Sequence, residues 1–128
     1  MLAAIAANAV LLLHLAFIVF AALGALLVVW RARWAWLHLP ALAWAVWIEV
    51  THGICPLTPL ENSLRRAAGE SGYAGGFIDH YLMPLIYPAG LTPAHQNAIA
   101  VTLAVANLLL YGFALLRRRS RTHPRAPR

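Results

Sequence analysis

The sequence predicts an all-α integral membrane protein with three transmembrane helices, and three apolar runs support this prediction. Residues 3–29 and 98–116 hold no charged residue, and residues 34–54 hold only Glu49. Each run is close to the roughly 20 residues that cross about 30 Å of hydrocarbon. The composition agrees, because 62% of the 128 residues are hydrophobic and 11% are charged, against about a quarter charged in an average soluble domain.

The three spans are expected at about residues 3–30, 36–54 and 94–116, within a single transmembrane domain of residues 1–116. The first apolar run is about twice as long as the apolar stretch of a secretory signal. In addition, no lysine or arginine precedes Arg31. We therefore interpret this run as a retained span.

Arginine placement predicts the topology. Arg31 and Arg33 follow the first span, and a basic tail occupies residues 117–128. The tail begins with Arg117, Arg118, Arg119 and Arg121. Cytoplasmic segments next to spans are enriched in arginine and lysine, so we expect both groups in the cytoplasm, the N-terminus in the periplasm and a cap of residues 55–93 outside. The expected partner of the tail is anionic lipid; nucleic acid is not expected, since no aromatic-rich RNA module accompanies the arginines.

A four-helix membrane bundle is the alternative fold, and it satisfies the same charge rule. If residues 73–91 also crossed, the N-terminus would move to the cytoplasm and the first arginine pair would move outside. Against this, the segment contains Asp79, whose carboxylate costs about 2.5–3.5 kcal/mol near a helix centre. It also contains Pro84 and Pro88, which remove backbone hydrogen bonds that lipid does not replace. Three spans are therefore favoured.

The cap carries a helix-start signal of its own. Residues Thr58–Glu61 read Thr-Pro-Leu-Glu, a capping box with proline at the first helical position. The pattern predicts a short amphipathic helix from Pro59 to about Ala68. Glu61 should pair with Arg65, which follows one turn later on the same face.

The remainder of the cap is apolar. Residues 77–88 are too few to cross the membrane and too apolar to stay in water, so we expect an interfacial or re-entrant helical segment with its tyrosines at the headgroups. Thr92 and Pro93 repeat the pattern of a cap residue followed by proline, which predicts the start of the last span.

Polar residues of the spans converge on the outer side. At about 1.5 Å per residue, His14 lies roughly 24 Å and His52 roughly 22 Å from the inner turn, so both reach the same level. Glu49 lies about one helical turn deeper, and His38 lies at the opposite boundary and is left out. Ionisable groups within spans usually face a bundle interior or a water-filled cavity. The predicted pocket comprises His14, Glu49, His52, Cys55, Asp79 and His80.

One interpretation of this pocket is a metal or haem site. Glu49 and His52 have the i, i+3 spacing that puts a carboxylate and an imidazole on one helical face, as in di-iron bundles. Di-iron proteins need two such motifs and two further glutamates, and this chain has one motif. The candidate ligands are His14, Glu49, His52 and His80, for zinc, copper, iron or a haem held between two histidines.

Two other interpretations stay open. Cys55 is the only cysteine and is a further ligand, a reactive thiol beside a cation, or half of a disulfide with another chain. Alternatively, the pocket groups are structural contacts between helices, as Asn8 and Asn107 would be, in a non-enzymatic membrane component that packs against a partner protein or a second copy of itself. No hydrolase, nucleotide-binding or zinc-protease motif is present, so an enzyme is the less favoured class.

Residues 52–88, HGICPLTPLENSLRRAAGESGYAGGFIDHYLMPLIYP, resemble a family of small bacterial membrane proteins, the domain-of-unknown-function family DUF2784. The resemblance extends from about Leu11 to Tyr111 and includes the segments LLLHLAFIVF and WLHLPALAW. It implies a location in the bacterial inner membrane. It implies no established activity and assigns no catalytic or ligand residues, so the predicted pocket depends on spacing and depth alone.

Overall fold

Every element of the described chain is a helix. The computed structural model describes residues 1–86 and 90–122. In chain order the elements are α1 (Leu2–Trp30), η1 (Ala32–Trp34), α2 (Ala35–Val50), α3 (Leu57–Ala67), the π-helix η2 (Ile78–Leu82), α4 (Met83–Ile86) and α5 (Pro93–Thr122). No strand occurs in these residues, so the all-α class predicted from the sequence is confirmed.

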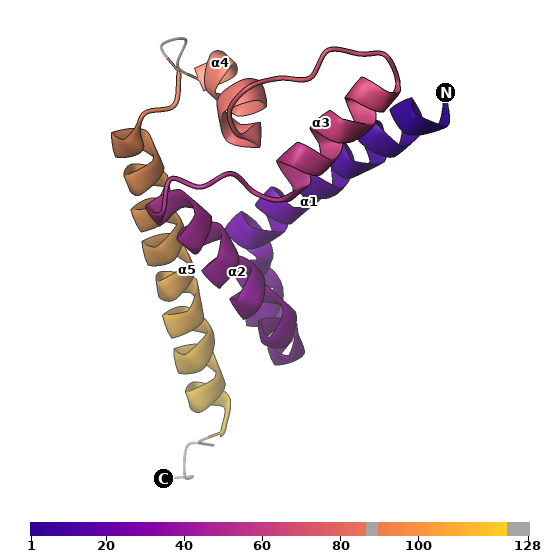
Figure 1. Cartoon of the computed structure of the whole chain (residues 1–128). Helices are drawn as coiled ribbons and strands as arrows, with labels where there is room; N and C mark the ends of the chain where they lie inside the picture. The colour runs from indigo at the N-terminus through magenta and orange to yellow at the C-terminus, as the bar shows by residue number, and fades with distance from the viewer. Residues whose placement is uncertain (87–89, 123–128) are drawn as a thin grey trace, which may run out of the picture.

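Three helices form a bundle and α3 lies outside it. α1, α2 and α5 pack against one another, while α3 runs along the N-terminal half of α1 (Figure 1). α1 and α5 are parallel, because Asn107 Nδ2 donates to the carbonyl of Ala21 at 3.4 Å and, further along both helices, Arg118 donates to the carbonyl of Val28 at 3.0 Å. α2 runs the opposite way, since the short turn at residues 31–34 returns the chain beside α1.

The bundle exposes large apolar side chains and buries small ones. Among the described residues, α1 and α5 are the helices long and apolar enough to cross a membrane, and they coincide with the first and third predicted spans. On their outer surfaces Leu12 is 64% exposed and Leu108 is 73% exposed, whereas Ala21 and Ala25 of α1 are buried. Small residues at the contacts let helix backbones approach closely, as in membrane bundles.

α2 ends four residues earlier than the predicted second span. It ends at Val50, where the N–H of Gly53 donates to the carbonyl of Ile48 and the N–H of His52 donates to the carbonyl of Glu49. These two bonds form a Schellman motif, which requires a left-handed residue after the helix. His52 is that residue, with φ of 53°. The expectation that Glu49 and His52 share one helical face is therefore wrong, because His52 lies beyond the helix end.

The two predicted helix starts have different outcomes. α3 begins at Leu57, two residues before the predicted start, and Thr58 is buried inside its first turn without a capping bond. The capping box predicted for α3 is therefore wrong. The start predicted for the last span is confirmed, because α5 begins at Pro93 and Thr92 Oγ1 accepts a hydrogen bond from the N–H of His95 at 3.3 Å.

The apolar segment of the cap folds over one end of the bundle. η2 and α4 cover residues 78–86, near the start of α5 (Figure 1). Phe77, just before η2, is buried, with its ring 4.3 Å from that of His14 in α1. The described residues between α3 and α5 contain no helix long enough to cross a membrane. Tyr87 and Pro88 of the predicted interfacial segment lie outside the described residues.

His38 is fully buried at the centre of the bundle. The sequence had suggested a position at the inner boundary, and the residue was left out of the predicted pocket. Its Nε2 lies 3.2 Å from the carbonyl of Ala21 and its Nδ1 lies 3.0 Å from the hydroxyl of Tyr111. Because a carbonyl only accepts, Nε2 carries the proton and Nδ1 accepts from Tyr111. The imidazole thus joins all three bundle helices through two hydrogen bonds. Gly24 of α1 leaves the room that this ring fills.

Candidate functional site

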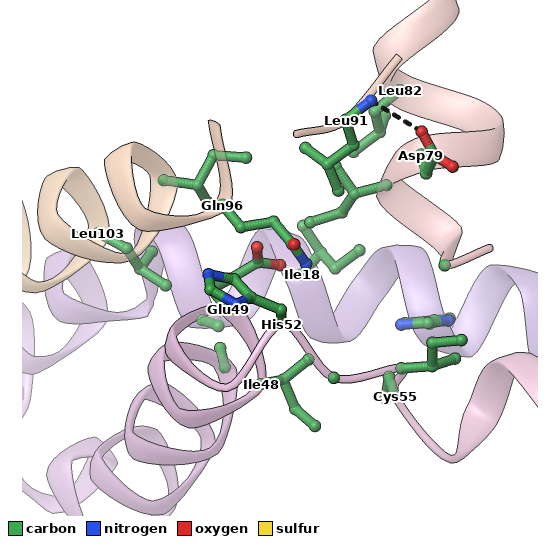
Figure 2. A pocket seen from close by; sticks show the side chains of 18 of the residues that line it. Ile18, Ile48, Glu49, His52, Cys55, Asp79, Leu82, Leu91, Gln96 and Leu103 are labelled. Carbon is green, nitrogen blue, oxygen red and sulfur yellow. Dashed lines mark hydrogen bonds between the residues drawn. The ribbon is translucent and has the colours of Figure 1, made fainter. Parts of the chain in front are cut away.

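A cavity of about 490 Å³ lies between α1, α2, η2 and the start of α5. Most of its wall is apolar and comes from side chains such as Ile18, Ile48 and Leu103. Its polar lining residues are His14, Glu49, His52, Cys55, Asp79 and Gln96. Five of the six residues of the predicted pocket therefore line one cavity, together with Gln96, which sequence reasoning did not include (Figure 2).

Glu49 is the most buried acid of this cavity. It lies in the last turn of α2 and is 7% exposed. Its Oε2 is buried and has no hydrogen-bond partner among the described residues. Figure 2 shows its carboxylate close to His52, with Gln96 extending toward both from the first turn of α5. A buried carboxylate oxygen without a partner is costly, so a hydrogen-bond donor brought to this atom would lower the free energy of the folded protein.

His52 owes its position to the end of α2. It is the one non-glycine residue with a positive φ in the described chain, a conformation that glycine usually supplies. Its Nε2 lies 3.2 Å from Oδ1 of Asn97 and donates to it, which links the end of α2 to the first turns of α5. A left-handed backbone at a bulky residue is costly, and such positions cluster at functional sites.

His14 contributes the second unsatisfied atom. Its side chain is 3% exposed, and its ring lies against Phe77 at a tilt of 41°. The Nδ1 atom is buried without a hydrogen-bond partner in the described part of the chain. His14 of α1 and Glu49 of α2 therefore each carry one unpartnered polar atom, and both residues line the same cavity.

The cap supplies the remaining polar wall. Asp79 lies in the π-helix η2, and its Oδ1 accepts a hydrogen bond from the N–H of Leu91 at 2.9 Å. Gly75, with φ of 82°, gives the carboxylate room, because a Cβ there would lie 2.6 Å from Asp79 Oδ2. Cys55 is a free, half-buried thiol on the chain that leaves α2. π-Helices are rare and frequently occur at functional sites.

The cavity residues are not arranged as a metal centre. The described chain contains no group of three His, Cys, Asp or Glu side chains that could hold a metal ion. Of the four candidate ligands, His80 does not line the cavity: it is exposed and stacks on Tyr73 with ring centroids 4.0 Å apart. The two histidines predicted to hold a haem, His14 and His52, both line the cavity. Nε2 of His52 bonds Asn97, and the ring of His14 packs against Phe77.

The chain matches the family model described as Protein of Unknown function (DUF2784) over residues 4–112. The chain belongs to this family. The matched region begins in α1 and ends in α5, so it contains every residue of the cavity, and the resemblance inferred from the sequence is confirmed. No curated protein and no solved structure matches the chain.

The two asparagines predicted to bridge helices differ in their surroundings. Asn107 is fully buried within the family match, and its Nδ2 donates to the carbonyls of Leu103, Ala21 and Ala22. Asn8 lies on the exposed surface of α1. Neither asparagine lines the cavity of Glu49.

The arginines that predicted the topology gather at the end of the bundle opposite the cavity. Arg31 lies 5.9 Å from the centre of the Trp30 ring, and Arg118 donates to the carbonyl of Val28 in the last turns of α1. The other arginines of this end, Arg33, Arg117 and Arg119, have exposed side chains. The side chain of Arg121 lies outside the described part of the structure.

A second polar cluster, which sequence reasoning did not include among the site residues, holds the cap together. Glu61 is fully buried in α3, where it accepts hydrogen bonds from Arg65 Nε at 2.8 Å and from the hydroxyls of Tyr73 and Tyr81, both at 2.9 Å. The predicted pairing of Glu61 with Arg65 is therefore confirmed. The two tyrosines gave no sequence signal for this role, because tyrosine beside an apolar segment is equally typical of the headgroup region.

The three groups that donate to Glu61 keep their protons, because the pKa of each is raised. Burial raises the pKa of Tyr73 and of Tyr81, and their hydrogen bonds to Glu61 raise it further. The hydrogen bond from Arg65 to Glu61 raises the pKa of the arginine, so its charge is retained. Two neutral hydroxyls and one guanidinium therefore surround the buried side chain of Glu61, and each of the three groups donates a hydrogen bond to it.

Proposed function

We propose that the protein is a small bacterial inner-membrane protein that binds an amphipathic small molecule in the cavity. The observation that carries this proposal is the cavity itself: it is largely apolar, holds about 490 Å³, and is lined by Glu49 and His14, whose buried atoms Oε2 and Nδ1 no described residue satisfies. Ligand sites in proteins are mostly apolar clefts of about 300–1,000 Å³ with a few polar groups that fix orientation.

The apolar surface supports a membrane location. Large apolar side chains are exposed on each bundle helix, including Leu23 at 55%, Trp47 at 62% and Leu116 at 67%. A water-soluble monomer rarely exposes so continuous an apolar surface. Lipid is the environment that suits all three helices, with α2, at 16 residues, the shortest of the three.

Helix direction supports three spans over four. In a three-span chain α1 and α5 are parallel and both arginine groups lie at one end, as the hydrogen bond from Arg118 to Val28 requires. In a four-span chain α1 and α5 would be antiparallel. The positive-inside rule assigns the arginine-rich end to the cytoplasm, so the N-terminus and the cavity face the periplasmic side.

This topology is tested by cysteine labelling in intact cells of a Cys55→Ser variant. Ser71 in the cap and Ser120 near the end of α5 are both exposed, so each is replaced by cysteine in turn. We expect a membrane-impermeant maleimide to label Ser71→Cys in intact cells and Ser120→Cys only after the membrane is permeabilised. The reverse pattern would refute the proposed orientation, and labelling of both in intact cells would refute the three-span chain.

Ligand binding is tested by filling the cavity. Ala45 on α2 lines the cavity, whereas Ala43, two residues earlier, is exposed and does not. Ala45→Leu should remove the molecule that copurifies with the protein, as seen by native mass spectrometry after gentle extraction from membranes. Ala43→Leu adds the same side chain outside the cavity and should keep it.

Equal occupancy in the two variants, or no copurifying molecule in the unsubstituted protein and no binding of added amphipaths, would contradict the proposal. The polar cluster would then be a set of structural contacts in a membrane component that packs against a partner protein or a second copy of itself.

A further inference from the structure

The polar groups of the cavity define the kind of head group that it accepts. Its wall carries two carboxylates, from Glu49 and Asp79, and no arginine. The cap arginine Arg65 is already bonded to Glu61 and Glu70. Glu49 Oε2 is an acceptor without a donor, in a setting where an anionic head would meet like charge at low dielectric. A head that donates a hydrogen bond satisfies this atom, and a phosphate or carboxylate does not.

A second hollow adjoins the first and follows α5. It is an open groove of about 540 Å³ that shares four wall residues with the cavity: Ala22, Met83, Ile99 and Leu103. The rest of its wall runs from His95 to Asn107 and includes the small side chains Ala98, Thr102 and Ala106. Twelve residues of helix correspond to about 18 Å, the length scale of an extended lipid chain.

Together these observations identify a ligand class. We propose that the ligand is a single-chain amphipath with a hydrogen-bond-donating head, a hydroxyl or a protonated amine. The head donates to Glu49 Oε2, and the chain leaves the cavity past Met83 to lie in the α5 groove. This inference rests on the proposed function and specifies its ligand. The two hollows share four wall residues and are therefore neighbours, which favours the chain of one ligand, rather than a second protein, in the groove.

The head group is tested with four probes of equal chain length in phosphatidylcholine nanodiscs: hexadecanol, hexadecylamine, hexadecanoic acid and hexadecyl methyl ether. Occupancy of the full-length protein is measured by native mass spectrometry at neutral pH. We expect the alcohol or the amine to bind at least about tenfold more tightly than the acid and the ether, because only the first two supply the missing donor to a charged acceptor. Equal binding of the acid or the ether would overturn the assignment of the head.

Glu49→Gln separates the two possible heads. A carboxamide oxygen still accepts from an alcohol but does not attract a cation, so the variant should keep hexadecanol within a few fold and lose hexadecylamine. If Glu49→Gln binds both probes as tightly as the unsubstituted protein does, the proposed role of Glu49 is wrong. If Ala45→Leu excludes the probes while all four bind alike in the unsubstituted protein, the proposed binding function holds and the donor-head inference fails.

The groove is tested with neighbouring substitutions on α5. Thr102 lines the groove, whereas Val101 is 62% exposed and does not. Thr102→Trp should weaken hexadecanol on the order of tenfold, because it fills the space of the chain, and should leave the short-chain alcohol butanol unaffected. Val101→Trp should change neither. Equal binding of hexadecanol to both tryptophan variants would overturn the placement of the chain in the groove.

Discussion

Replacing Glu61 with alanine should lower the free energy of unfolding of the cap by about 3–5 kcal/mol, the usual cost of removing one partner of a buried ion pair. Glu61 is fully buried and accepts from Arg65, Tyr73 and Tyr81. Without it, the guanidinium loses its buried partner and two hydroxyls lose their acceptor, and each loss adds a desolvation cost. Thermal unfolding in detergent, followed by tyrosine fluorescence and circular dichroism, measures the change.

Glu70→Ala is the matched control, because Glu70 pairs with the same arginine from the surface. Its carboxylate lies 2.9 Å from Arg65 Nη1, but its side chain is 45% exposed. An exposed pair contributes about 0–1 kcal/mol, so this variant should remain close to the unsubstituted protein. Similar losses in the two variants would show that the burial of Glu61 is not what stabilises the cap.

The Glu61 cluster also bears on the proposed ligand site. It joins α3 to Tyr73 in the following loop and to Tyr81 within η2. The same π-helix presents Asp79 to the cavity. Loss of Glu61 should therefore loosen the cavity wall as well as α3, and ligand occupancy should fall together with stability in Glu61→Ala but not in Glu70→Ala.

The sequence predicted the parts of the fold that depend on apolar length. The runs at residues 3–29 and 98–116 became α1 and α5, because in each a long apolar stretch and helix propensity favour the same structure. The end of α2 was not predictable in this way. A Schellman motif normally has glycine in its left-handed position; here His52 takes that position and Gly53 follows, so the usual signal is displaced by one residue.

The candidate site was predicted by depth rather than by motif. Counting residues from the inner turn put His14 and His52 at one level, and both line the cavity. His80 does not line it. It was included because it belongs to the cap above the spans, and membership of the cap does not say which way a side chain points: in η2, Asp79 lines the cavity, whereas His80 is exposed and stacks on Tyr73. His38 was missed because its depth suggested a boundary, whereas its packing against a glycine is visible only in three dimensions.

Gly24→Ala should destabilise the bundle by about 1–3 kcal/mol, the usual cost of overpacking a well-filled core. A Cβ at this position would collide with Cδ2 of the His38 ring. The ring has little freedom to move, because its two nitrogens are bonded to Ala21 and Tyr111 and Phe20 packs edge-on against it at 5.4 Å. Unfolding in detergent, followed by the helical circular dichroism signal, measures the loss.

Gly112→Ala isolates the packing effect from helix propensity. Gly112 lies in α5, and a Cβ there would have no heavy atom within 4 Å beyond its own helix. Alanine is favoured over glycine inside a helix by about 1 kcal/mol, so this variant should be unchanged or slightly more stable. The same propensity gain applies at Gly24, which makes any loss there a lower limit on the cost of displacing His38. Equal stability of the two variants would mean that the His38 ring can move away from α1 without a loss in the free energy of unfolding. The buried imidazole would then not fix the spacing of the three helices.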